Sequence, residues 1–183
     1  VGGGTLNFVG AQVVTLTGDF NWASNTPTDF RNSVVTINRE GVSDDLLIDG
    51  LLRVQSEDDV FNVEVKIGAT GELELQGVST LRTTTFNENI TNAGTIELTG
   101  GVFAGADEGV VLQLGGGAML TNLAGGTILS SGSYDSRTII GNVINQGLID
   151  VNYPITVDGN ITNTGVVDLT SSQALVLTGL LDN

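Results

Sequence analysis

Cysteine and histidine are both missing from this chain of 183 residues, and their absence removes several kinds of chemistry. Without cysteine the chain has no disulfide scaffold, and without either residue it has no Cys/His zinc site. Nucleophilic catalysis by a Ser–His or Cys–His pair is excluded for the same reason. The lack of cysteine does not by itself identify a cellular compartment.

Basic residues and long apolar runs are also scarce. The sequence has 6 Lys and Arg against 21 Asp and Glu, so its formal net charge is −15. A surface this acidic repels phosphate groups, and we therefore expect no nucleic-acid partner and no anionic membrane partner. No apolar run approaches the ~20 residues of a membrane-spanning helix, so membrane insertion is not expected.

Helix signals are weak as well. Proline occurs twice, aromatic residues make up 5% of the chain, and glycine is abundant at 26 residues. No stretch of ten residues shows a convincing helical period, whereas apolar and polar residues alternate with period two in many segments. Such alternation, bounded by Gly, Asn, Asp and Ser, predicts short strands and tight turns. With 40% hydrophobic residues, the chain can form one folded domain with a core.

The sequence does contain a recurring phrase, in which a glycine is followed by alternating apolar and polar residues. The phrase occurs at 50–54, 71–75, 94–98, 147–151 and 165–169, with a degenerate copy at 126–130. The intervals between these glycines are 21, 23, 32, 21 and 18 residues. A repeat of this length fits one turn of a parallel β-helix, with three short strands and their corners. The sequence therefore predicts an all-β fold, a right-handed parallel β-helix solenoid of about eight coils.

Alternate residues of each phrase face the same side of a strand. The apolar pairs are expected to stack inward as aliphatic columns: Leu52/Val54, Leu73/Leu75, Ile96/Leu98, Ile149/Val151 and Val167/Leu169. The residues between them, together with Leu129 of the degenerate copy, are expected to face outward: Arg53, Glu74, Glu97, Asp150 and Asp168. Since a slip of one residue would expose a whole column, the register should be well fixed.

Asparagine precedes several of the phrase glycines. Asn92, Asn145 and Asn163 stand two residues before glycine, and Asn122 belongs to a looser version of the motif. Asparagine tolerates left-handed backbone angles, and its amide can bond to its own turn or to a neighbouring coil. Two interpretations stay open, namely a ladder of these four amides along one edge, or four separate caps of individual turns.

The repeats extend over most of the chain without a linker. We expect a single β-helix domain over 1–183, with irregular first coils in 1–45 and a loop insertion at 100–109 that accounts for the longest interval. The chain starts at Val1 without a leader, and neither end resembles the polar cap of a solenoid. We therefore expect an excerpt of a longer solenoid, or a subunit whose ends are covered by neighbours.

Three segments share a further similarity. Residues 90–96, 120–128 and 161–167 each join an Ile/Leu-Thr-Asn sequence to glycine and an aliphatic residue. They resemble repeats of large bacterial surface proteins, the parallel β-helix adhesins and autotransporter-passenger-like proteins, and the segment from Trp22 to Ile37 looks like a stretch common in them. The resemblance covers roughly residues 45–183 and is one of repeat style. It implies an exported protein, extracellular or on the cell surface, with a structural or adhesive role, and it transfers no catalytic residue.

Catalytic candidates are few. A glycoside hydrolase needs two carboxylates ~5–10 Å apart, and the best clusters are Asp44-Asp45 and Glu57-Asp58-Asp59, for which a solvated turn is the default interpretation. A polysaccharide lyase needs a cationic groove, which Lys66 and five scattered arginines do not supply. We therefore expect no catalytic residue, no cofactor and no enzyme, with a polysaccharide-active protein as the alternative.

Metal binding is a separate question. If coils stack ~4.8 Å apart, Glu74 lies beside Glu97 and Asp150 lies beside Asp168. Like charges at this spacing repel by roughly 1 kcal/mol in water. A Ca²⁺ ion would offset the repulsion, because it prefers carboxylate and carbonyl oxygens. Screening by ordinary salt is the interpretation we favour, since no Asp-x-Asp-x-Asp-Gly loop is present.

Together these features favour a structural or adhesive β-helical rod that associates end to end. The expected partners are other copies of the chain or flanking coils, with a glycan or a host surface as further candidates. The alternative function is a carbohydrate-binding or carbohydrate-cleaving β-helix. The alternative fold is a β-sandwich of antiparallel hairpins, for which Asp49-Gly50 and Asp158-Gly159 would serve as turns.

Overall fold

The structure is a computed structural model, and it consists of strands and their corners. It describes residues 12–16, 20–22, 28–31, 34–41, 45–55, 58–77, 80–101, 109–132, 135–170 and 172–183. Within these residues there are 23 strands and no helix, in three sheets of eight, eight and seven strands. Every strand pair in the described residues is parallel. The parallel β-helix is confirmed, and the antiparallel sandwich is wrong.

Each sheet takes every third strand of the chain. Sheet A contains β1 (Gln12–Leu16), β4 (Val35–Arg39), β7 (Asp59–Asn62), β10 (Arg82–Phe86), β13 (Val110–Leu114), β16 (Arg137–Ile140), β19 (Ile155–Asp158) and β22 (Leu175–Leu177). Sheet B contains β2 (Phe20–Trp22), β5 (Asp45–Ile48), β8 (Glu64–Ile67), β11 (Ile90–Asn92), β14 (Met119–Asn122), β17 (Asn142–Asn145), β20 (Ile161–Asn163) and β23 (Leu181–Asp182). Sheet C contains β3 (Thr28–Arg31), β6 (Leu51–Gln55), β9 (Glu72–Gln76), β12 (Thr95–Thr99), β15 (Thr127–Ser131), β18 (Leu148–Val151) and β21 (Val166–Leu169).

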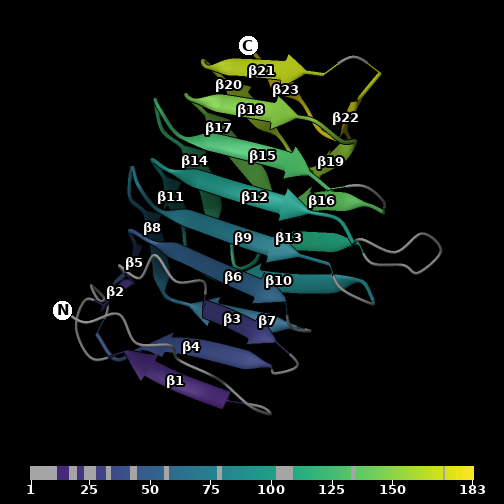
Figure 1. The fold of residues 1–183 in the computed structure, drawn as a ribbon. Coiled ribbons are helices and arrows are strands. Elements are labelled where there is room, and N and C mark those ends of the chain that lie inside the picture. The colour runs from purple at the N-terminus through teal and green to yellow at the C-terminus, as the bar shows by residue number, and fades with distance from the viewer. Residues whose placement is uncertain are drawn as a thin grey trace.

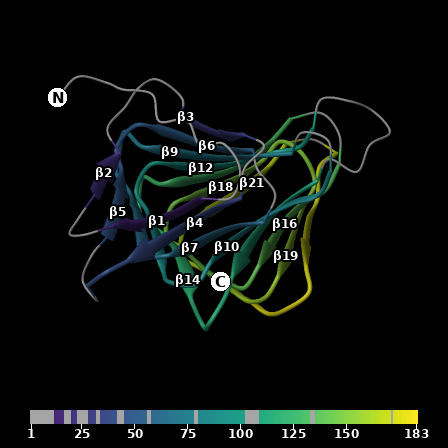
Figure 2. The same cartoon turned by 90° about the horizontal axis from the view of Figure 1, so that it is seen from below.

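One strand from each sheet makes one coil, in the order A, B, C. In Figure 1 the sheet C strands run from left to right at the front, while the sheet A strands run from right to left behind them as the chain rises. The solenoid is therefore right-handed. Figure 2, seen from below, shows the three sheets as the sides of a roughly triangular cross-section. The glycine phrases of the sequence form the strands of sheet C.

The core consists of columns of aliphatic side chains that run along the axis. In sheet C the register places one above another Leu52, Leu73, Ile96, Ile128, Ile149 and Val167. The first five of these side chains are at most 3% exposed. The predicted inward columns are thus present, and the period-two pattern of the phrases is explained by burial of one face of the strand.

The neighbouring column has one polar interruption. It contains Val54, Leu75, Leu98, Ser130 and Val151, and Ser130 is 1% exposed. The Ser130 hydroxyl donates to the carbonyl of Tyr153 at 2.6 Å, so the buried oxygen has a partner. Serine at this position accounts for the degenerate form of the phrase at 126–130.

Two segments that the sequence sets apart are only partly described. Strands β1 to β4 join the same three sheets as the later coils, in parallel register, and the rest of 1–45 lies largely outside the described residues. Of the expected insertion at 100–109, residues 102–108 lie outside them. Its ends are bonded to adjacent coils, with Gly100 N donating to Ser131 O at 3.3 Å and Gly109 O accepting from Arg82 N at 2.9 Å. The described part of the chain holds no helix suited to crossing a membrane.

Candidate functional site

The outward face of sheet C carries a column of charged residues. The register stacks in one line Arg53, Glu74, Glu97, Leu129, Asp150 and Asp168. The structure therefore brings Glu74 beside Glu97 and Asp150 beside Asp168, as the repeat spacing predicts. Leu129 separates the two acidic pairs, so the four carboxylates do not form one site.

Protein side chains already contact the first acidic pair. Arg53 Nε donates to Glu74 Oε2 at 2.6 Å, and Glu74 is 7% exposed. The Ser131 hydroxyl donates to a carboxylate oxygen of Glu97. An arginine on one side and a hydroxyl on the other thus offset part of the like-charge repulsion.

Glu72 is a third carboxylate beside this pair. Burial raises the pKa of Glu72 above its ordinary value, and the hydrogen bond with Glu97 and the negative charges of Glu97 and Glu74 raise it further. The charge of Arg53 lowers the pKa of Glu72, but by less than these effects raise it. The raised pKa of Glu72 thus reflects partial burial and the close approach of the carboxylates of Glu74 and Glu97.

A cation site would need more ligands than these pairs provide. Among the described residues, no group of three or more Asp, Glu, His or Cys side chains is placed to hold a metal ion. Ca²⁺ takes about 6–8 oxygen ligands. The proposed role of Glu74, Glu97, Asp150 and Asp168 as metal ligands thus stays a hypothesis, which the surroundings of Glu74 and Glu97 disfavour.

Of the acidic clusters suggested for glycoside hydrolysis, the fold separates the environments of Asp58 and Asp59. The carboxylate of Asp45 forms a salt bridge with the ammonium group of Lys66 on the adjacent coil. Asp59 is fully buried and accepts a hydrogen bond from Val35 N at 2.7 Å, whereas Asp58 is exposed with a φ of 56°. Asp44 and Glu57 lie outside the described residues. Asp58 and Asp59 therefore point to different environments and do not face a common groove.

The four motif asparagines lie one above another at the corner between sheets B and C. They are joined by side-chain hydrogen bonds, in which Nδ2 of each donates to Oδ1 of the next: Asn92 to Asn122 at 2.8 Å, Asn122 to Asn145 at 2.7 Å and Asn145 to Asn163 at 2.7 Å. Asn163 continues to Asn183 at 2.6 Å. The side chains of the first three are completely buried. Each amide thus links two coils.

The ladder also binds the backbone of its corner. Asn122 Nδ2 donates to Gly126 O at 3.2 Å and to Leu148 O at 3.1 Å, and Asn145 makes the corresponding bond to Val166 O at 3.1 Å. The sequence offers two reasons for asparagine at these corners, tolerance of left-handed backbone and bonding by the amide, and the structure supports the second. The non-glycine residues with positive φ in the described chain are Asp58, Asp135 and Ser172. Asparagine is required here for its paired donor and acceptor.

The ladder begins only at the fourth coil. Below Asn92 the same column contains Ile67 and then Ile48. This explains why the two earlier phrases, after Gly50 and Gly71, lack the asparagine motif. The lower coils fill the corner with aliphatic side chains and the upper coils fill it with amides.

A second row of asparagines was missed in the sequence. Asn87 Nδ2 donates to Asn62 Oδ1 and Asn62 Nδ2 donates to Asn38 Oδ1, both at 2.7 Å. These residues lie at or just beyond the C-terminal ends of β4, β7 and β10, at the corner between sheets A and B. The signal was present, because each asparagine directly follows Ile37, Phe61 or Phe86.

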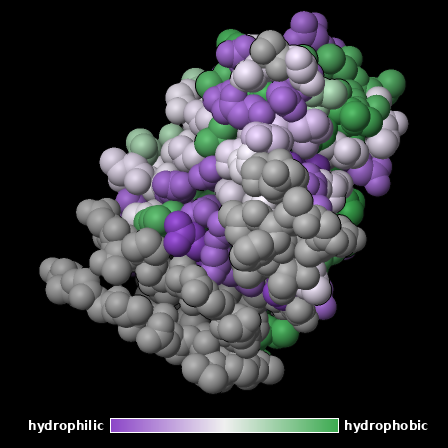
Figure 3. Space-filling model, turned by 45° about the vertical axis from the view of Figure 1, so that its right-hand side comes forward, coloured by the Kyte–Doolittle hydropathy of each residue, from purple (hydrophilic) through white to green (hydrophobic). Residues whose placement is uncertain are grey.

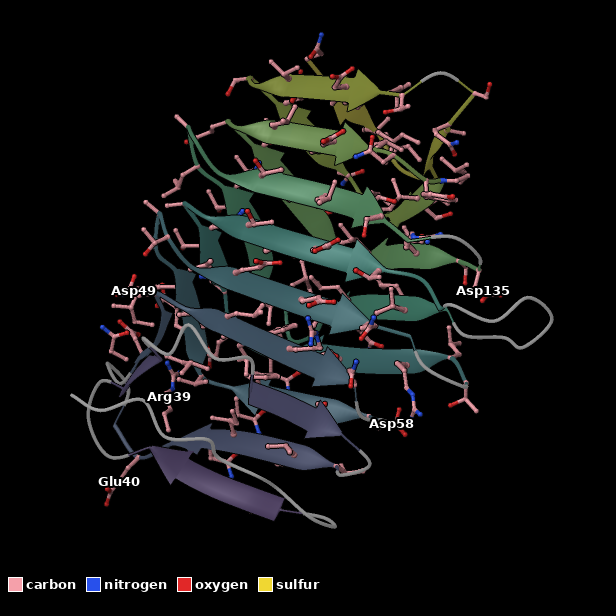
Figure 4. All side chains as sticks on the ribbon, viewed as in Figure 1. Arg39, Glu40, Asp49, Asp58 and Asp135 are labelled. Carbon is pink, nitrogen blue, oxygen red and sulfur yellow. The ribbon has the colours of Figure 1, made fainter. Side chains whose placement is uncertain are left out.

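A buried arginine was also missed. Arg137 is 1% exposed, its Nε donates to Ser131 O at 2.7 Å, and its Nη1 donates to Asp135 O at 2.6 Å. The guanidinium lies 4.8 Å from the ring centroid of Tyr153. Burial lowers the pKa of Arg137, whereas Tyr153 and Asp135 raise it. Figure 4 shows Asp135 on the turn that precedes β16.

The phrase glycines line a shallow groove outside the asparagine ladder. The groove has a volume of about 620 Å³ and includes Gly126, Gly147, Gly165, Gln146 and Thr164. A Cβ atom built on Gly147 would lie 2.3 Å from Gly126 O, and one built on Gly165 would lie 2.2 Å from Gly147 O. Close approach of successive coils therefore requires these glycines, and the groove is a consequence of that packing.

Comparison of the chain with protein-family models, with curated proteins and with solved structures found no match. The findings above thus rest on the chain's own geometry. They establish a parallel β-helical solenoid with an acidic outer sheet, an internal amide ladder and a neutral groove. None of these features brings together the groups of a catalytic centre within the described residues.

Proposed function

We propose that this chain is a stiff structural rod of an exported bacterial surface protein, with an adhesive role carried by its loops. The observation that supports the proposal most directly is the unbroken contact between successive coils. An aliphatic column and an amide ladder both run along the axis, so that bending would separate buried side chains at every coil. Rigidity of this kind suits a scaffold that holds other surfaces at a distance.

Charge and repeat style support the extracellular setting. A net charge of −15 keeps a β-rich protein soluble and keeps its long faces from associating. The Ile/Leu-Thr-Asn repeats that resemble bacterial adhesins and autotransporter passengers are the segments that build the amide ladder. The resemblance thus involves residues with a structural role in this chain.

Hydrogen exchange tests the rod directly. If the coils form one rigid body, the backbone amides of β9, β12, β15 and β18 should exchange slowly and with similar protection factors. The reason is that opening any coil exposes its neighbours. Independent protection of separate coils, each opening at its own low free energy, would contradict a stiff rod. X-ray scattering from the monomer should agree with an elongated rigid particle.

Carbohydrate binding is the second candidate function. The neutral groove beside the ladder favours it, because Thr127, Gln146 and Thr164 offer uncharged hydrogen-bonding groups next to Leu148 and Val166. A glycan array together with a reducing-sugar assay separates the candidates. Selective binding of a neutral glycan that is lost in Gln146→Ala would favour this function, and the absence of both a ligand and a product would favour the structural one.

A further inference from the structure

The groove beside the asparagine ladder is built from one unit that repeats along the axis. Each of three successive coils contributes a corner residue, a glycine and the first residue of a sheet C strand. The corner residues are Ala124, Gln146 and Thr164, and the strand residues are Thr127, Leu148 and Val166. The register places the three strand residues one above another. Equivalent groups therefore recur along the groove at the ~4.8 Å spacing of neighbouring strands.

The groove belongs to the side of the solenoid. Strands β15 and β18, which carry Thr127 and Leu148, each have a described strand on both sides in sheet C. The same outward row continues in the other direction to Thr95 and then to Glu72. A row of uncharged side chains thus extends over the four strands β12, β15, β18 and β21, and it ends at the carboxylate of Glu72.

The backbone of the groove is already bonded within the solenoid. The N–H groups of Thr127, Leu148 and Val166 donate to carbonyls of the preceding coil at 2.8, 2.9 and 2.8 Å. The carbonyls of the same three residues accept from amides of the asparagine ladder at 3.0, 3.1 and 3.1 Å. A peptide that adds itself to a sheet as a further strand needs backbone groups that are open to it. A ligand of this groove must therefore be recognised by side chains.

The side chains of the groove suit a ligand that carries many hydroxyl groups. Thr127 and Thr164 present hydroxyls, and Gln146 presents an exposed amide, so the groove both donates and accepts hydrogen bonds. Leu148 offers an aliphatic surface for the C–H face of a sugar ring. The glycines of the floor leave no side chain between such a ring and the backbone. Uncharged polar groups beside apolar surface are the usual lining of a small-molecule site.

Carboxylates flank the groove on its sheet C side. The acidic column runs parallel to the groove, two residues further along each strand and thus ~6–7 Å away, and Glu97, Asp150 and Asp168 carry its charge there. Figure 3 shows hydrophilic surface in purple next to pale surface of intermediate hydropathy on the upper coils. The carboxylates repel uronates and sulfated sugars, but they accept hydrogen bonds from neutral hydroxyls. Charge thus selects a neutral sugar over an anionic one.

A straight groove with one repeating unit fits a straight ligand with one repeating unit. We propose that the groove binds an extended, linear, neutral polysaccharide that lies along the solenoid axis, with successive sugars on successive coils. The inference rests on the second candidate function, carbohydrate binding, and adds the class and the direction of the ligand. Because each added sugar contacts a further copy of the same unit, affinity increases with chain length until the groove is filled.

Isothermal titration calorimetry with oligosaccharides of increasing length tests the proposal. The probes are the extended cello-, manno- and xylo-oligosaccharides, each from the disaccharide to the hexasaccharide. In at least one of these series the hexasaccharide should bind at least about tenfold more tightly than the disaccharide. Two hexasaccharides serve as controls, the helically wound maltohexaose for shape and hexagalacturonate for charge. Both should bind at least about tenfold more weakly than the best extended hexasaccharide.

A pair of lysine variants locates the bound sugar. Leu148 and Ile144 are half-buried, outward-facing aliphatic residues of the same coil, but Leu148 lines the groove and Ile144 lies on sheet B outside it. Leu148→Lys places a long side chain in the groove and should weaken binding of the hexasaccharide at least about tenfold. Ile144→Lys adds the same charge and should change the affinity by less than about twofold. Circular dichroism and thermal melting check that both variants fold.

The possible failures of the test are distinct. If no extended hexasaccharide binds, this proposal and carbohydrate binding are both overturned. If the disaccharide binds as tightly as the hexasaccharide, or if Ile144→Lys weakens binding as much as Leu148→Lys, carbohydrate binding stands and the axial polysaccharide is overturned. Tight binding of hexagalacturonate contradicts the selection of neutral sugars by the acidic column. The rod is tested separately by hydrogen exchange, and none of these results affects it.

Discussion

Asn122 and Asn145 lie 23 residues apart in the sequence and are joined by a hydrogen bond of 2.7 Å from Nδ2 to Oδ1. Both side chains are completely buried. Each amide donates upward, accepts from below and also binds the backbone of its own corner, so the usual cost of burying an amide is offset. The ladder therefore fixes the register of the coils in a way that aliphatic stacking alone does not.

Truncation of one asparagine in the ladder should lower the free energy of unfolding. In Asn145→Ala, Asn122 loses the acceptor of its side-chain bond, and Val166 O and Asn163 Oδ1 lose their donor. We expect a loss of roughly 2–3 kcal/mol in the free energy of unfolding, measured by urea denaturation. Gln146→Ala, one residue along and exposed, should stay within about 0.5 kcal/mol of the parent. Equal effects of the two substitutions would show that the ladder contributes no net stability.

Gly147→Ala tests the close approach of successive coils. The added Cβ would lie 2.3 Å from Gly126 O and 2.4 Å from Leu123 O, and backbone atoms cannot move aside easily. We expect a loss of about 3 kcal/mol or more in thermal or urea unfolding. Gly117 provides the comparison, because it has a φ of 87° but open space around its Cβ direction. Gly117→Ala should cost only about 1–2 kcal/mol from left-handed backbone strain, and a reversed order would contradict the packing argument.

The repeats determine how much of this fold is predictable from the sequence. Glycine spacing and period-two alternation are local, so they predict the sheet C strands, the inward columns and the neighbours of Glu74 and Asp150. The second asparagine row was not predicted from the sequence. Its motif, an aromatic or aliphatic residue followed by asparagine, is short and lacks a glycine. Burial of Arg137 was not predicted because charged residues are seldom buried, and the partners that compensate it, Ser131 O, Asp135 O and the ring of Tyr153, are brought together by the fold.

The raised pKa of Glu72 predicts a dependence of stability on pH. A carboxyl whose pKa is higher in the folded state stabilises the fold below its ordinary pKa of 4.5, and this contribution is lost as pH rises through the folded-state pKa. At pH 7 the charged group is therefore unfavourable. Glu72→Gln should raise the melting temperature by about 2 °C at pH 7, and the difference should shrink toward pH 4. Asp182→Asn makes the same change in charge at an exposed position, and it serves as the control that should show a smaller gain.

Calcium should act on this protein only through ionic strength. Asp150 and Asp168 are register neighbours, but two carboxylates supply only part of the oxygen shell that Ca²⁺ requires. The melting temperature in CaCl₂ should equal that in NaCl of matched ionic strength. A sample with chelator gives the melting temperature of the metal-free protein. A saturable rise specific to Ca²⁺ that disappears in Asp150→Asn would reveal a structural ion and contradict this expectation.

Arg137 should be irreplaceable by lysine. Its planar guanidinium donates to Ser131 O and Asp135 O in two directions while it stacks on Tyr153, and an ammonium group cannot reproduce that geometry. We expect Arg137→Lys to lose roughly 2–3 kcal/mol at pH 7. Arg53→Lys, at the partly exposed pair with Glu74, should lose less than about 1 kcal/mol.

The pH dependence of the lysine variant separates burial from geometry. Burial already lowers the pKa of Arg137, and a lysine ammonium in the same place would have its pKa lowered too. The unfolded chain then binds more protons than the folded one between the two pKa values, so the stability of Arg137→Lys should rise from pH 7 to pH 9 relative to the parent. A deficit that stays constant over this range would assign the whole loss to the missing hydrogen bonds and leave burial of the charge without an energetic effect.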